Sequence, residues 1–62
     1  MEKAIYTAVL SDCEVTFKED PEILRAFLDS QLECLEVKNL DTDEVVLLNK
    51  SKVIYFIKTN EN

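Results

Sequence analysis

A run of strand-forming residues, followed by a stretch in which apolar and polar positions alternate, predicts two strands at the start of the chain. Residues 4–10 (AIYTAVL) are rich in strand-forming residues, and residues 12–18 (DCEVTFK) alternate, with Cys13, Val15 and Phe17 on one side. The Ser-Asp pair at the junction predicts a hairpin turn. Because this turn lacks the favoured Asn-Gly or Asp-Gly pair, we expect its loop to be wider than two residues.

A helix is predicted next, in the segment EDPEILRAFLDSQ. Asp20 is a good N-cap and Pro21 fits the first helical position. Residues 31–36 are open to two interpretations, because no glycine marks the end of the helix. The helix either continues to about Glu36 or ends near Ser30 and is followed by a strand, and the alternation after it favours the shorter helix. Its apolar stripe consists of Ile23, Leu24, Phe27 and Leu28.

The C-terminal half predicts three more strands. The turn signal NLDTD (residues 39–43) separates the third strand from VVLL, and VIYFI forms the last strand after NKSK. Residues 1–62 are therefore expected to form a single α+β domain of order ββαβββ. Such a domain suits a strongly bent antiparallel sheet, or a small SH3-like or Sm-like barrel with one helix. The similarity to those barrels is in element order alone, and no family is assigned.

The composition argues against an enzyme. The chain has no glycine, which excludes phosphate-cradling loops, and no histidine, the commonest general base and metal ligand. We predict no catalytic residue, no cofactor and no metal. Cys13 and Cys34 are expected to be free, buried thiols. Neither a membrane-spanning stretch nor a secretory signal is evident, so the prediction is a cytoplasmic protein, cellular or phage-encoded.

Charge is distributed unevenly along the chain, whose net charge is −6. Residues 12–44 carry eleven carboxylates against three basic residues, whereas residues 45–60 carry Lys50, Lys52 and Lys58 and no acid. These three lysines form a candidate basic patch, with a polar turn and a protected edge strand as the alternative explanation. The acidic balance disfavours direct nucleic-acid binding. The clustered acids in LDTDE are interpreted as an exposed loop, because the glycine of a calcium loop is missing.

The apolar surplus of the last two strands predicts an interaction surface. In VVLL and VIYFI successive side chains face opposite sides, yet nearly all are apolar, and one short helix covers only one face of a sheet. We therefore predict a regulatory module that binds a protein partner and forms a homodimer or higher oligomer. The alternatives are an acidic nucleic-acid mimic and an Sm-like RNA binder using the lysine-bearing hairpin. The candidate interface residues are Val46, Leu48, Ile54, Tyr55 and Phe56.

Overall fold

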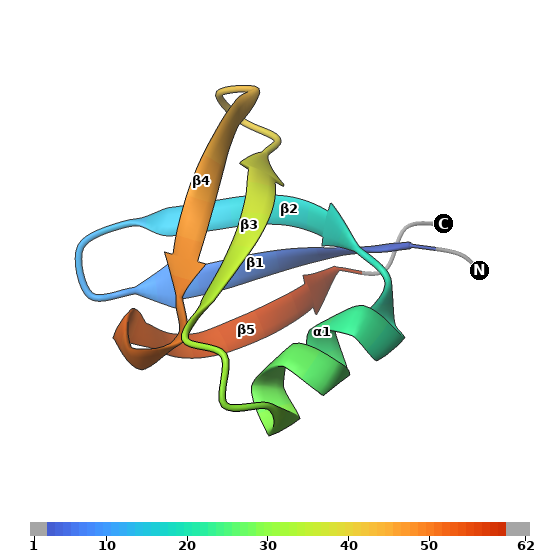
Figure 1. The fold of residues 1–62 in the computed structure, drawn as a ribbon. Coiled ribbons are helices and arrows are strands. Elements are labelled where there is room, and N and C mark those ends of the chain that lie inside the picture. Colours follow the sequence, from blue (N-terminus) through green and yellow to red (C-terminus); the bar gives the residue numbers. More distant parts are fainter. Residues whose placement is uncertain (1–2, 60–62) are drawn as a thin grey trace.

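The computed structural model describes residues 3–59, which form an α+β fold of two antiparallel sheets and one α-helix (Figure 1). The predicted order ββαβββ is confirmed. A 3-10 turn, η1, lies in the NKSK segment between the last two strands. The elements are β1 (Ala4–Leu10), β2 (Glu14–Glu19), α1 (Pro21–Asp29), β3 (Cys34–Asn39), β4 (Glu44–Asn49), η1 (Lys50–Lys52) and β5 (Val53–Thr59).

The larger sheet has the strand order β2-β1-β5, so β1 lies in the centre. Its alternating pattern sends Tyr6 and Ala8 to one face, where Tyr6 pairs with Phe17 of β2 and their rings stack at 5.9 Å. Phe56 of β5 meets Phe17 edge-on at 6.3 Å. Ala8 lies between Val15 and Phe56 and is fully buried, since only a small side chain leaves room for the layer above it.

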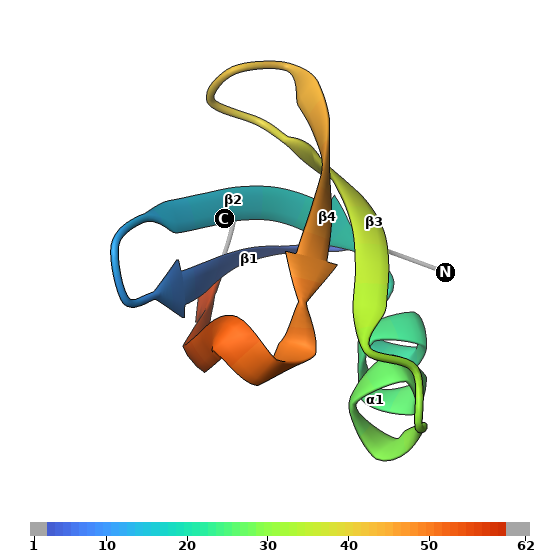
Figure 2. The ribbon, with the colours of Figure 1, turned by 60° about the vertical axis from the view of Figure 1, so that its left-hand side comes forward.

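The smaller sheet is the hairpin of β3 and β4, which rises across the larger sheet (Figures 1 and 2). Val37 of β3 and Leu48 of β4 point inward and are buried. The two sheets are joined where the Leu40 N–H donates to the Thr16 carbonyl at 2.8 Å. They do not close into a barrel, so the fold is a pair of packed open sheets rather than the SH3-like or Sm-like alternative.

The helix α1 follows the shorter of the two sequence interpretations and ends at Asp29. The Asp20 side chain accepts from the Glu22 N–H at 2.9 Å, as expected of an N-cap. At the other end, the Ser30 hydroxyl donates to the Phe27 carbonyl at 2.8 Å. Leu24 and Phe27 are buried, whereas the other half of the predicted stripe, Ile23 and Leu28, is exposed.

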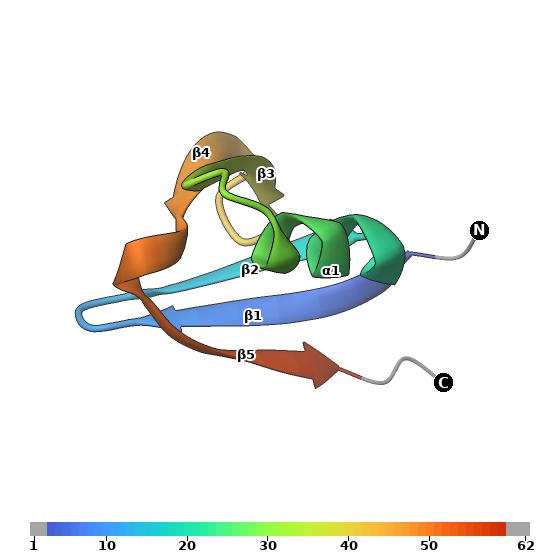
Figure 3. The same ribbon diagram turned by 60° about the horizontal axis from the view of Figure 1, so that its bottom comes forward.

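The core lies between the larger sheet and the layer formed by α1 and the β3–β4 hairpin (Figure 3). Both cysteines are free, as expected, but the prediction that they are buried is wrong. Cys13 falls in the β1–β2 loop, where the Leu10 N–H donates to its carbonyl at 2.9 Å. Cys34 begins β3 and is also exposed. The buried residues are Tyr6, Ala8, Val15, Phe17, Leu24, Phe27, Val37 and Leu48.

Candidate functional site

The two apolar strands predicted to share one surface lie in different sheets. β4 pairs with β3, whereas β5 pairs with β1. Of the candidate interface residues on β4, Leu48 is buried and Val46 packs partly against the core. These two side chains are therefore core residues of the hairpin.

A bulge in β5 changes which of its residues face outward. Val9 pairs with Tyr55, but the next residue, Leu10, pairs with Val53, so Ile54 has no partner in the ladder. Ile54 is exposed, while Phe56 packs on the core. Strict alternation places Val53 beside Tyr55 on the outer face. The bulge reverses this, and Val53 packs against the core.

The larger sheet has one face that no described element covers. Figure 3 shows α1 and the hairpin on one side of β2, β1 and β5 and no element on the other. The Thr7 and Thr16 hydroxyls meet on this open face at 3.2 Å. Tyr55 is 53 % exposed and Ile57 is 45 % exposed. We define the outer-face patch as Ile5 and Val9 of β1 with Tyr55 and Ile57 of β5.

The β1 half of this patch was missed from the sequence. Ile5 and Val9 occupy alternate positions on β1, opposite in phase to Tyr6 and Ala8. The signal was present in AIYTAVL, where apolar residues fall on both faces, but only the last two strands were assigned a surplus. Pairing of β1 with β5 is what brings the two halves together.

A second exposed apolar pair, Val45 and Leu47, lies on the outer side of the hairpin. Their cross-strand partners are charged, because Leu47 pairs with Glu36 and Val45 with Lys38. Charged neighbours solvate the hairpin surface and divide its apolar area. The β1 members of the outer-face patch also have charged partners on β2, but on their other side they adjoin Tyr55 and Ile57 of β5, so this patch is less interrupted.

The candidate basic patch is not assembled as a cluster. Lys50 Nζ donates to the Ser30 carbonyl at 2.8 Å and lies 4.8 Å from the centre of the Phe27 ring. A cation here satisfies an open carbonyl at the helix C-terminus and interacts with the ring face. Lys52 and Lys58 are exposed, and the five residues of β5 between them give an extended span of up to about 20 Å. Lys50 is thus a structural residue.

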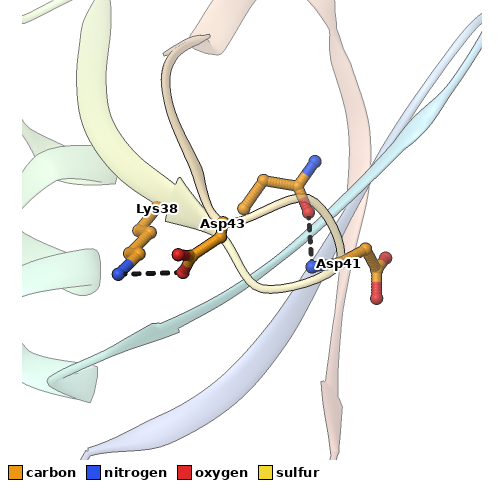
Figure 4. Close-up of polar contacts among 4 residues, drawn as sticks. Lys38, Asp41 and Asp43 are labelled. Carbon is orange, nitrogen blue, oxygen red and sulfur yellow. Dashed lines mark hydrogen bonds and ion pairs between the residues drawn. The ribbon is translucent and has the colours of Figure 1, made fainter.

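The acidic cluster of the β3–β4 loop is explained by turn geometry (Figure 4). Asn39 Oδ1 accepts from the Asp41 N–H at 3.0 Å, and its carbonyl accepts from the Asp43 N–H at 2.7 Å. Lys38 Nζ forms an ion pair with Asp43 at 2.9 Å. Among residues 3–59, no group of three or more potential ligands is placed to hold a metal ion.

Cys13 is an exposed thiol with reduced nucleophilic character. Partial desolvation and, after it, the charge and hydrogen bond of the Asp12 carboxylate raise the pKa of the Cys13 thiol. A raised pKa leaves less of the reactive thiolate at neutral pH. This cysteine therefore does not have the electrostatic surroundings of a catalytic nucleophile.

Comparison with known proteins gives no assignment: no family model, no curated protein and no solved structure matches the chain. In the part of the chain that the structure describes, no helix has the length and apolar character needed to cross a membrane.

Proposed function

We propose that this chain is a non-enzymatic, cytoplasmic regulatory module that binds another protein through the outer-face patch. The observation that carries the proposal is the uncovered face of the larger sheet, on which Val9 pairs with Tyr55, and Ile57 pairs with Thr7 between Ile5 and Val9. Contiguous apolar surface rimmed by polar residues is typical of protein–protein contact sites. Lys18 and Glu14 of β2 provide such a rim, since they pair with Ile5 and Val9.

Two further observations support the proposal. The free, exposed Cys13 and Cys34 suit a reducing compartment, where disulfides are rare. Lys50, one of the three lysines of the candidate basic patch, donates instead to the Ser30 carbonyl at the end of α1.

The test is capture of a partner from cells of the native host, using the tagged chain and two variants of the patch. Val9→Lys and Ile5→Lys place a charge on the outer face and leave the core side of β1 unchanged. Leu47→Lys is the matched control, because Leu47 is a more exposed apolar residue on the other sheet. We expect one stoichiometric protein to bind the wild type and Leu47→Lys, and to be lost with both β1 variants. Equal capture by all four proteins contradicts the proposal.

A second candidate function is mimicry of nucleic acid by the acidic surface. It is favoured by the charge pattern, because the chain has 13 carboxylates and Lys38–Asp43 is the one ion pair found among residues 3–59. Binding of this kind is abolished by high salt, whereas binding through the outer-face patch persists. Repeating the capture in about 0.5 M NaCl therefore separates the two functions.

A further inference from the structure

Among residues 3–59, no strand pairs with the edge of β5 that faces away from β1. The direction of the backbone groups at this edge follows from the pairing of β1 with its neighbours. The Leu10 N–H donates toward β2, and successive residues of a strand point their backbone groups to opposite sides. The backbone N–H and C=O groups of Val9 and Thr7 therefore point toward β5, where Val9 pairs with Tyr55 and Thr7 with Ile57.

The same alternation sets the direction of the remaining groups of β5. Tyr55, Ile57 and Thr59 pair with β1, so the N–H and C=O groups of Phe56 and Lys58 point to the free edge. Among residues 3–59, no other backbone group pairs with these four. An unpaired edge of this kind is a template for another strand.

We propose that this edge pairs antiparallel with the same edge of a second copy of the chain, centred on Ile57. The dimer concerns the edge of the sheet, whereas the proposed function concerns its face. In this register Phe56 of each copy lies opposite Lys58 of the other. The free N–H and C=O groups of both residues therefore form hydrogen bonds across the edge. Two three-stranded sheets become one sheet of six strands, with both outer-face patches on the same side.

Neighbouring registers are less favourable. A register centred on Lys58 places two ammonium groups directly opposite, which is destabilising. Registers centred on Tyr55 or Phe56 bring the bulge at Ile54 into the ladder, and a bulge disrupts pairing. The Ile57 register uses only the regular part of β5, from Tyr55 to Thr59.

The charge pattern favours the edge of β5 over the other strand edges for pairing with a second copy. Two molecules of net charge −6 repel each other, and the edge strands β2, β3 and β4 each carry at least one carboxylate, whereas β5 carries none. The edge of β5 is thus where two copies approach with the least repulsion. Because five residues a side make a small interface, we expect a weak dimer that dissociates on dilution.

The first test is the mass of the purified chain, measured by analytical ultracentrifugation from roughly 1 μM to 1 mM, the range of weak complexes. We expect twice the chain mass at the upper end and a single chain at the lower end. Lys58→Pro removes an edge N–H that β1 does not use, and it should abolish the dimer. Lys58→Ala keeps that N–H and should retain the dimer. A monomer throughout the range, or a dimer that survives Lys58→Pro, overturns the proposal.

The second test reads the register directly and does not depend on proline being tolerated. In a Cys13→Ser, Cys34→Ser background, Ile57→Cys places two thiols opposite each other in a non-hydrogen-bonded pair, at a separation that suits a disulfide. Tyr55→Cys is the matched control, because Tyr55 lies opposite Thr59 and is four residues from its own copy. We expect mild oxidation to cross-link only the Ile57→Cys protein. Cross-linking of Tyr55→Cys alone refutes the register.

These outcomes are independent of the test of function. A monomer whose partner is still lost with Val9→Lys overturns the dimer and leaves the proposed function intact. A cross-linked dimer that captures no partner supports the dimer and contradicts the proposed function.

Discussion

Asp43 has a backbone conformation that its side chain tolerates and most others do not. Its φ of 65° is the one positive value among residues 3–59, and it allows the β3–β4 loop to return to the sheet. Aspartate enters this left-handed region at less cost than residues with larger side chains, and glycine enters it freely.

We therefore predict that Asp43→Ala is less stable than Asp43→Gly by about 1 kcal/mol. Both variants lose the exposed ion pair with Lys38. The difference between their free energies of unfolding therefore reports the cost of the backbone conformation alone. Urea unfolding gives the two free energies. Asp41 is the control position, because its φ is not positive and alanine there should be at least as stable as glycine. Equal stability of the two Asp43 variants contradicts the prediction.

The Cys13 thiol offers a second prediction at the residue scale. The Asp12 carboxylate contributes to the raised pKa of Cys13, so Asp12→Asn should lower that pKa and increase the thiolate fraction at pH 8. We expect alkylation of Cys13 to become about two- to fivefold faster, followed by mass spectrometry. Cys34, in the same molecule, is the internal reference and should react at an unchanged rate. An unchanged rate at Cys13 would mean that desolvation alone sets its pKa.

At the scale of elements, α1 is held to the rest of the fold at its C-terminus. Lys50 donates to Ser30 and covers the Phe27 ring, and the Lys50 N–H donates to the Glu33 carbonyl at 2.7 Å. η1 thus closes the end of the helix and anchors the α1–β3 loop.

Lys50→Met keeps the apolar stem and removes the charge, and we predict a loss of about 1–2 kcal/mol in the free energy of unfolding. Lys52→Met, two residues away and exposed, should change stability by less than about 0.5 kcal/mol. Thermal unfolding of the two variants measures the contrast. Similar losses in both would show that the contact of Lys50 contributes nothing specific.

Elements were predictable from the sequence where the signal is local. The period of two predicted β2 and β3, the strand-forming residues of 4–10 predicted β1, and Asp20 with Pro21 predicted the start of α1. Strict alternation along β5 fails at Ile54, because a bulge depends on the partner strand and leaves no mark in an apolar run. The contact of Lys50 was not predictable, because its partner, Ser30, is 20 residues away in sequence.

At the scale of the whole molecule, the acidic residues and the apolar strand β5 lie in different parts of the protein. This separation determines where two copies associate. The eleven acids of residues 12–44 lie on β2, α1, the β3–β4 hairpin and the adjoining loops, while β5 carries one lysine and no acid. Association through β5 therefore adds apolar and backbone contacts, and the acidic remainder opposes it through long-range repulsion. The balance between these two terms is set by salt.

We predict that the dimer dissociation constant falls, by roughly two- to tenfold, when NaCl is raised from about 0.1 M to about 1 M, because the screening length shortens from about 10 Å to about 3 Å. Sedimentation equilibrium at several salt concentrations measures it. Asp41→Lys, in the loop remote from β5, changes the net charge from −6 to −4 (−6 + 2). This variant should dimerise more tightly at low salt and depend less on NaCl. A dissociation constant that rises with salt would instead show that opposite charges attract across the interface, which the pairing of two β5 edges does not provide.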